Sequence, residues 1–336
     1  MVYALEPAGA PAAARSWRRG LERIALVLAV LAGLGWWFRA PLATAALFGA
    51  MRAFAPPFHQ DLGFTTTADG LRIAYATSGR GPPVVVVLGW ITHLENGANS
   101  PVYDGPGLIS AASREHFLVR YDGRGFGLSD RQARDFGLDA RVRDIEAVVD
   151  ALQLSRFSIW GQSAGGPASV AYTARHPERV ARLVLASSMA SENHLSPEQR
   201  AQFEHVLALV ESDWQTPGVP EMFAAVLAKG RPSDVWSAIG AEFMRRSADG
   251  PQIAGFMRAQ LAIDASAEAR QIRTPTLVIH AREDEVISLE AGRDLAALIP
   301  GARFEIVEGG HMAGTGNTLE TMNRILAFMD EGDGSR

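Results

Sequence analysis

Apolar runs alternate with helix-length amphipathic segments along most of this chain, from about residue 61 onward. The apolar runs are short and rich in β-branched residues, so they predict strands that are buried on both faces. Such alternation is typical of the α/β class, in which helices cover both faces of a mostly parallel sheet. We predict strands at 71–76, 84–88, 117–121, 157–160, 183–186, 276–280 and 304–307, with helices that include 142–151, 164–176 and 290–298.

The strand pattern stops between Met189 and about Ala269, where helical periodicity takes over. Long insertions between core strands usually form lids or binding elements over an active face. We therefore expect a helical cap at 190–269, between two parts of a catalytic core at 57–189 and 270–330, and a flexible tail at 331–336. Most of the large apolar cap residues should pack onto the core. Trp214 and Trp236 are candidates to face the pocket, which would favour an apolar substrate portion.

Residues 1–56 form a separate basic and apolar segment. Arg15, Arg18, Arg19 and Arg23 precede an apolar run at 24–38, and a second run covers 40–51. The first run has about 15 residues, fewer than the roughly 20 that cross a bilayer. It fits a signal peptide or signal anchor, with a small-residue cleavage pattern at 43–45. It also fits helices that dock on a membrane or cover the pocket, or an ordinary buried helix. We expect membrane association through residues 15–55 and a membrane-associated or exported bacterial protein, and a cytoplasmic location stays open.

Composition narrows the functional classes. The 336 residues are 47% hydrophobic, which is sufficient for a large core. The formal net charge of -5 provides no basic surface for a phosphate backbone, so we expect no nucleic acid partner. The chain contains no cysteine, which removes disulfides, thiolate metal sites and a cysteine nucleophile. A small-molecule substrate is the expected partner, and the oligomeric state stays open.

A G-x-S-x-G motif marks the candidate nucleophile. Gly161, Gln162, Ser163, Ala164 and Gly165 lie directly after a predicted strand and directly before a predicted helix. A serine at such a sharp turn has strained backbone geometry, needs small neighbours and projects its hydroxyl above the sheet. The flanking strand and helix make this match much more specific than the motif alone.

An unassisted serine hydroxyl is a poor nucleophile, so Ser163 needs a general base and an acid that orients the base. After such a turn the partners follow along the chain in the order acid, then histidine. One predicted strand leads into a loop with Asp284, and the last predicted strand is followed by Gly309, Gly310 and His311. We therefore predict His311 as base and Asp284 as acid. Glu283 and Glu285 are the alternatives to Asp284, and the other histidines are interpreted as structural.

A tetrahedral oxyanion needs two preorganised donors, usually backbone N–H groups. The residue after the nucleophile, Ala164, provides one, and Trp90, in the loop after an early strand, is predicted to provide the other. The Trp90 side chain either forms a wall of the acyl pocket or is a packed aromatic without a catalytic part. Ile91, His93 and Met312 are further candidates for the pocket.

Residues 64–328 resemble the α/β-hydrolase superfamily. Besides the motifs above, Asp122 to Ser129 resemble its D-x-R-G-x-G-x-S turn, and Arg175 to Val180 resemble its passage from helix to strand. The resemblance implies a mostly parallel sheet of eight-stranded type with an inserted helical cap, a serine hydrolase activity of carboxylesterase type, and no cofactor or metal. Residues 90–95 with 100–103 also look like a bacterial subgroup often attached to cyclase or regulator domains. Leu88 and Gly89 depart from the His-Gly pair of many relatives.

The leading hypothesis is hydrolysis of carboxylic esters with apolar, short to medium acyl groups through an acyl-enzyme. The same three residues also suit cleavage of a carbon–carbon bond, an amide or a lactone, or perhydrolysis, because specificity depends on the pocket. A third hypothesis is a small-molecule sensor or binding protein that uses the pocket without turnover.

Overall fold

The computed structural model describes residues 59–97, 108–192, 197–227, 233–314 and 318–331. All of them belong to one compact unit, Phe54–Arg336. The predicted membrane-associating segment, residues 1–56, and residues 332–336 of the predicted tail lie outside the described ranges. Within those ranges, no helix combines the length and apolar character needed to cross a membrane.

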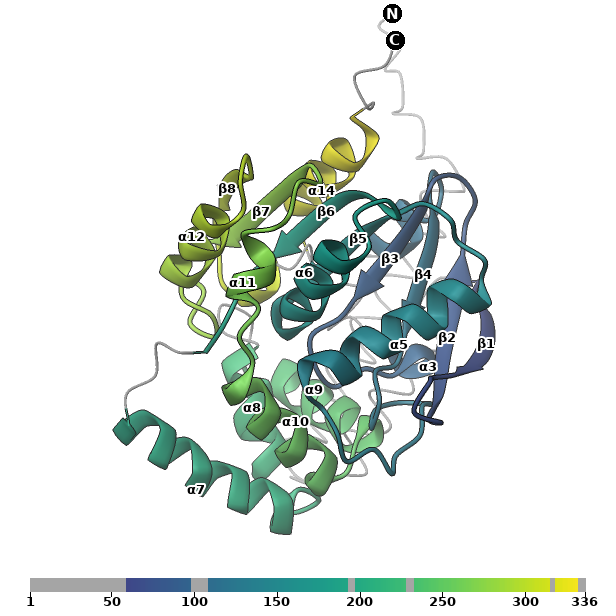
Figure 1. The fold of residues 1–336 in the computed structure, drawn as a ribbon. Coiled ribbons are helices and arrows are strands. Elements are labelled where there is room, and N and C mark those ends of the chain that lie inside the picture. The colour runs from purple at the N-terminus through teal and green to yellow at the C-terminus, as the bar shows by residue number, and fades with distance from the viewer. Residues whose placement is uncertain (1–58, 98–107, 193–196, 228–232, 315–317, 332–336) are drawn as a thin grey trace, which may run out of the picture. The chain divides into compact units, whose positions relative to one another are not determined.

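An eight-stranded sheet forms the centre of the unit, in the order β1-β2-β4-β3-β5-β6-β7-β8 (Figure 1). The first two pairings, β1 with β2 and β2 with β4, are antiparallel, and the others are parallel. The prediction of a mostly parallel α/β sheet is therefore confirmed. The strands are β1 Asp61–Thr66, β2 Arg72–Ser78, β3 Pro83–Val87, β4 Phe117–Tyr121, β5 Phe157–Gln162, β6 Val180–Ala186, β7 Thr276–Ala281 and β8 Arg303–Val307.

Alternate residues of the central strands enter different cores. In β3, Val85 and Val87 join the core beneath α5 (Leu138–Ala151), α6 (Gly166–Arg175) and α12 (Leu289–Leu298). Val84 and Val86 join the core beneath α4 (Leu108–Ala112) and α14 (Leu319–Asp330). Successive side chains of a strand point to opposite faces, so a strand covered on both sides is apolar at every position. This explains why the sequence pattern located the central strands to within a few residues.

The edge strand β1 was missing from the sequence prediction. Two of its apolar residues, Leu62 and Phe64, lie on one face and remain 43% and 51% exposed. A strand that buries neither face completely has no continuous apolar run in its sequence. The pairing of β1 with β2 depends on backbone hydrogen bonds, which the hydrophobic pattern does not reveal.

Helices cover both faces of the sheet and form the inserted cap. The predicted helical character of 190–269 corresponds to α7–α10, with the short α11 packed beside α6 and α12 (Figure 1). The helices are α3 Leu94–Gly97, α4 Leu108–Ala112, α5 Leu138–Ala151, η1 Ser163–Gly165, α6 Gly166–Arg175, α7 Pro197–Asp213, α8 Val219–Leu227, α9 Ser233–Ser247, α10 Gly250–Ala262, α11 Ser266–Ala269, α12 Leu289–Leu298, α13 His311–Gly314 and α14 Leu319–Asp330.

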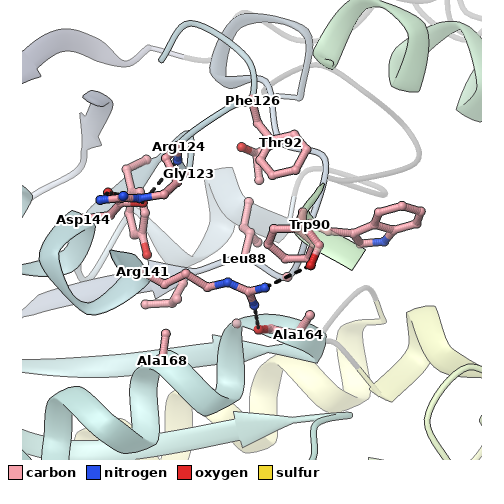
Figure 2. A pocket seen from close by; sticks show the side chains of 15 residues that line it. Leu88, Trp90, Thr92, Gly123, Arg124, Phe126, Arg141, Asp144, Ala164 and Ala168 are labelled. Atoms are coloured by element: carbon pink, nitrogen blue, oxygen red, sulfur yellow. Dashed lines mark hydrogen bonds and ion pairs between the residues drawn. The ribbon is translucent and has the colours of Figure 1, made fainter. Parts of the chain in front are cut away.

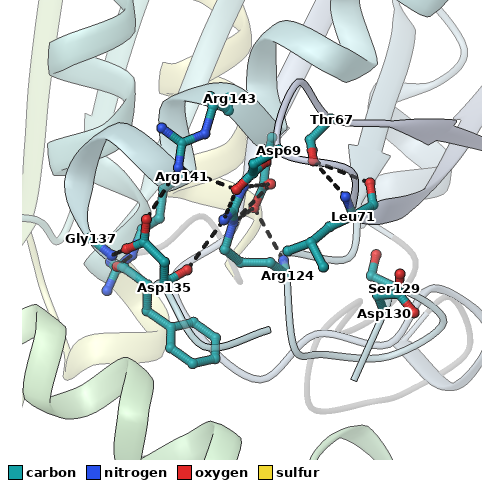
Figure 3. Close-up of polar contacts among 12 residues, drawn as sticks. Thr67, Asp69, Leu71, Arg124, Ser129, Asp130, Asp135, Gly137, Arg141 and Arg143 are labelled. Atoms are coloured by element: carbon teal, nitrogen blue, oxygen red, sulfur yellow. Dashed lines mark hydrogen bonds and ion pairs between the residues drawn. The ribbon is translucent and has the colours of Figure 1, made fainter. Parts of the chain in front are cut away.

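A buried ion-pair network fixes the turn after β4. Arg124, whose side chain is 2% exposed, donates to both carboxylate oxygens of Asp144 on α5 at 2.9–3.2 Å and to Asp69 at 2.8 Å. It also donates to the carbonyl of Asp135 (Figure 3). The hydrogen bonds from Arg124 hold the pKa of Asp69 well below its usual range, although partial burial acts in the other direction.

Replacing Arg124 with Met should destabilise the fold strongly. The change leaves the Asp144 carboxylate, 2% exposed, without its partner, and breaking a buried pair in this way costs about 3–5 kcal/mol. Urea denaturation of the variant and the wild-type protein measures the decrease in the free energy of unfolding. The matched control is Arg143→Met, because Arg143 binds Asp69 and Asp135 at 3.2 Å but is 30% exposed. The control should cost at most about 1 kcal/mol, and equal losses in both variants would contradict the assigned importance of burial.

Candidate active site

Ser163 occupies the sharp turn between β5 and α6. Its φ angle is +51°, a left-handed conformation that non-glycine residues rarely adopt outside functional turns. The small neighbours are required by close contacts: a Cβ atom on Gly165 would overlap the carbonyl oxygen of Val87, and one on Gly161 would press on the hydroxyl of Ser169. The backbone therefore holds Ser163 at the carboxyl end of β5, at the edge of the sheet where the parallel strands end, as the motif predicts.

Two serines outside the motif hold this turn in place. The Ser188 hydroxyl donates to the carbonyl of Ser163 at 2.7 Å, and the Ser169 hydroxyl donates to the carbonyl of Gly165 at 2.9 Å. The Ser163 carbonyl also accepts the backbone N–H of Gly166, so the Ser188 hydroxyl adds a second hydrogen bond at the turn. Neither serine belongs to the motif: Ser188 lies 25 residues from Ser163 along the chain, and Ser169 bonds back across one helical turn, so the sequence did not point to them.

The structure brings Ser163, His311 and Asp284 into one chain of hydrogen bonds. His311 Nε2 lies 3.1 Å from Ser163 Oγ, and His311 Nδ1 lies 2.8 Å from Asp284 Oδ2. The histidine and the aspartate are each 7% exposed. Asp284 Oδ1 accepts the backbone N–H groups of Val286 and Ile287, both at 2.9 Å. The carboxylate is thus fixed on one side by its own loop and faces the histidine on the other.

The alternatives Glu283 and Glu285 are exposed, and neither replaces Asp284 as the partner of His311. Burial alone would raise the pKa of Asp284, but the hydrogen bond and charge of His311 outweigh burial and hold that pKa below its ordinary value. The carboxylate therefore stays ionised, as a group that stabilises an imidazolium must.

His280 lies directly behind the carboxylate. It is fully buried on β7, its Nε2 donates to the carbonyl of Ile287 at 2.9 Å, and the same nitrogen lies 3.4 Å from Asp284 Oδ2. Burial lowers the pKa of His280, which favours a neutral ring. From the sequence this histidine was interpreted as structural, and its position beside the acid was not predicted. It is the penultimate residue of the strand that precedes the acid loop, which is the one sequence signal of this proximity.

The loop after β3 approaches the turn closely. A Cβ atom on Gly89 would lie 3.0 Å from Ser163 Cβ and 3.1 Å from the Ala164 nitrogen. Ile91, two residues further on, is fully buried with a φ angle of +49°, an unusual conformation for a β-branched residue. Trp90 therefore lies between a glycine packed on the turn and a strained residue, which is the setting expected for an oxyanion loop.

A pocket of about 420 Å³, including its open mouth, adjoins this loop (Figure 2). Its walls come from the ends of β3 and β4, from α5 and α6, and from the cap helix α10. The lining residues are Val87, Leu88, Gly89, Trp90, Thr92, Tyr121, Gly123, Arg124, Phe126, Arg141, Asp144, Ala164, Gly165, Ala168 and Phe256.

Of the candidate pocket residues whose side chains the structure describes, Trp90 alone lines this pocket. Trp214 is 2% exposed within the cap, and its ring packs on Phe223, which also contacts the Trp90 ring. The aromatic residue of the cap that does line the pocket is Phe256, whereas Ile91 is fully buried. His93 and Met312 are half-buried and do not line it. Trp236 belongs to α9, but its side chain lies outside the described part of the chain.

In the described ranges, no group of three or more His, Asp or Glu side chains is arranged to hold a metal ion.

The class of protein follows from this sheet, turn and cap together. The α/β-hydrolase fold family matches residues 82–315, and the chain belongs to this family. The chain is 28% identical to the 2-hydroxymuconate semialdehyde hydrolase of Pseudomonas putida, over 83% of this chain and 98% of that protein. It is 28% identical to the non-heme chloroperoxidase of Streptomyces lividans, over 80% and 99%. A crystal structure of a hydrolase from Pseudomonas aeruginosa PA01 is similar, with a TM-score of 0.66 and 28% identity over 80% and 98% of the two chains. The resemblance to a subgroup attached to regulator domains stays a prediction.

Replacing Asp284 with Asn should lower kcat about a thousandfold or more with a small change in KM. The amide preserves the shape but favours the wrong tautomer of His311 and stabilises the imidazolium less. Steady-state kinetics with a 4-nitrophenyl ester measure the effect. The controls are Glu283→Gln and Glu285→Gln, which should retain nearly full kcat. A large loss in either control with an active Asp284→Asn protein would assign the acid to the other carboxylate.

Proposed function

We propose that this hydrolase cleaves carboxylic esters with apolar, short to medium acyl groups through an acyl-enzyme. The observation that carries the proposal is the continuous chain of hydrogen bonds from Ser163 through His311 to Asp284 at a strained turn. Such a chain activates a serine, fixes the tautomer of the base and stabilises the charge that the base acquires.

In the proposed mechanism, Ser163 Oγ attacks the ester carbonyl while His311 Nε2 accepts its proton. The protonated His311 then donates this proton to the leaving alcohol, and the acyl group remains on Ser163. Water, deprotonated by the same nitrogen, attacks the acyl-enzyme and releases the acid. Asp284 stays ionised throughout and stabilises the imidazolium.

The oxyanion of each tetrahedral intermediate is assigned to the backbone N–H groups of Ala164 and Trp90. The close approach of Gly89 to the Ala164 nitrogen supports this assignment. Each donor of this kind contributes about 3 kcal/mol of transition-state stabilisation. The donors belong to the backbone, so the Leu88-Gly89 departure from His-Gly leaves them in place.

A second candidate is cleavage of a carbon–carbon bond, an amide or a lactone, or perhydrolysis, on the same residues. The names of the relatives support this second candidate, because they include a 2-hydroxy-6-oxo-2,4-heptadienoate hydrolase, a 3-oxoadipate enol-lactonase and a deacetylase. A panel of matched esters, amides, lactones and vinylogous 1,5-diketones separates these reactions by kcat/KM. A sensor without turnover remains the alternative from another class.

Fluorophosphonate labelling should modify Ser163 stoichiometrically. The label should vanish in Ser163→Ala and slow sharply in His311→Ala, because the neutral hydroxyl reacts slowly without its base. Intact mass and peptide mapping locate the adduct, and circular dichroism checks that each variant is folded. Folded wild-type protein that acquires no adduct would reject the serine mechanism and favour the sensor.

Membrane association through residues 15–55 stays a prediction from the sequence. Expression of the full chain and of a chain that begins at residue 57, followed by separation of membranes, provides the test. We expect only the full chain in the membrane fraction, and equal distribution of both would reject the prediction.

A further inference from the structure

Arg141 is a buried cation whose acceptors are all neutral. It lies in the first turn of α5, is 6% exposed and lines the pocket. Its Nε donates to the Phe136 carbonyl at 2.8 Å and its Nη1 to the Gln260 side-chain oxygen at 2.7 Å. Longer contacts reach the carbonyls of Ala164, 3.3 Å from Nη1, and Phe256, 3.4 Å from Nη2. The Phe256 ring covers the guanidinium at 3.8 Å.

The lack of a bonded carboxylate is unusual for an arginine in this position, because buried charges are normally paired. Arg124, which lines the same pocket, binds two carboxylates. One of these, Asp144, also lines the pocket, but Arg124 engages both of its oxygens. Burial lowers the pKa of Arg141 to about 9, although the nearby charge of Asp144 acts in the other direction. Among the described residues, the pocket thus contains one desolvated guanidinium that no carboxylate contacts directly.

We propose that Arg141 binds a carboxylate of the substrate, and that the preferred substrates carry this carboxylate on the acyl side, a few bonds from the carbonyl that Ser163 attacks. This inference rests on the proposed function for the identity of the reacting carbonyl. It adds a charged recognition group to a pocket that is otherwise mostly apolar.

The charge of Arg141 lies beside the turn that carries Ser163. Arg141 Nη1 contacts the carbonyl of Ala164, the residue whose N–H is assigned to the oxyanion, and Trp90 lines the same pocket. Figure 2 shows the guanidinium directed toward Ala164, with the Trp90 indole turned away from it. Among the described residues, neither Ser163 nor His311 lines the pocket, whereas Ala164 and Trp90, which are assigned to the oxyanion, do. The pocket therefore adjoins the oxyanion positions rather than the proton donor of the leaving group, which favours the acyl side.

The guanidinium has the capacity for this role. It offers five N–H donors in a planar fork that matches a carboxylate. Within the described part of the chain, Nη2 donates only to the Phe256 carbonyl, and the contacts to Ala164 and Phe256 are long and therefore easily exchanged. Leu88, Phe126 and Phe256 surround the site with apolar surface, which strengthens a charge-assisted hydrogen bond.

The test compares mono-4-nitrophenyl succinate with 4-nitrophenyl butyrate, which differ by a carboxylate in place of a methyl group. The wild-type protein should have the higher kcat/KM for the succinate. In Arg141→Met the ratio of kcat/KM, succinate over butyrate, should fall about 10- to 100-fold, the range expected for a hydrogen bond to a charged group. The control Arg143→Met, on the same helix but partly exposed and not lining the pocket, should leave the ratio unchanged.

An equal loss on both esters would overturn the proposal, because Arg141 would then serve only to hold Ala164 and α10. If Arg141→Met does not fold, Arg141→Lys replaces it, since lysine keeps the charge without the fork. An intermediate ratio is expected for the lysine variant, and an unchanged ratio overturns the proposal.

A binding measurement separates this inference from the proposed function. Calorimetry on the Ser163→Ala protein should detect succinate but not succinamide, with the succinate affinity reduced when Arg141→Lys is added and the signal lost when Arg141→Met is added. Such binding upholds the anion site even if neither ester is hydrolysed. Hydrolysis of butyrate without succinate binding upholds the esterase and rejects the anion site.

Discussion

The strained backbone at Ser163 is the constraint on which the rest of the site depends. A left-handed conformation at a non-glycine residue persists only when its surroundings determine it completely. Here β5 fixes the entry to the turn, α6 fixes the exit, and Gly89 packs against the turn from the neighbouring strand. The hydroxyls of Ser188 and Ser169 donate further hydrogen bonds to the carbonyls of Ser163 and Gly165 in the turn. The order of strands then places the loops after β7 and β8, which carry Asp284 and His311, on the same edge of the sheet.

Charge is distributed unevenly around this turn. Arg124 is neutralised by carboxylates and stabilises the loop after β4, whereas Arg141 makes only neutral contacts beside Ala164. Two buried arginines that line one pocket thus have different roles: one closes a structural network, and the other leaves a positive charge for a ligand. Arg141 also joins the core helix α5 to the cap residues Phe256 and Gln260, so substrate recognition and the position of α10 depend on one side chain.

The sequence was most informative where a residue's role depends on its neighbours along the chain. Central strands buried on both faces appear as continuous apolar runs, and the turn at Ser163 has its own motif, so both were located correctly. The edge strand β1 was missed because it buries neither face fully. The separation of Asp284 from Glu283 and Glu285 required the fold, since only direction and burial distinguish the three. The cap was predicted as helical, but which aromatic side chain faces the pocket depends on packing, and Phe256 rather than Trp214 does so.

The proposed mechanism requires a covalent intermediate at Ser163. Rapid mixing of the protein with 4-nitrophenyl butyrate, followed by acid quench and peptide mapping, measures this intermediate most directly. We expect a burst of nitrophenol stoichiometric with the protein and a butyryl group on the peptide that contains Ser163. Turnover of the ester with neither burst nor adduct at any substrate concentration, and with full activity retained in Ser163→Ala, would contradict the mechanism.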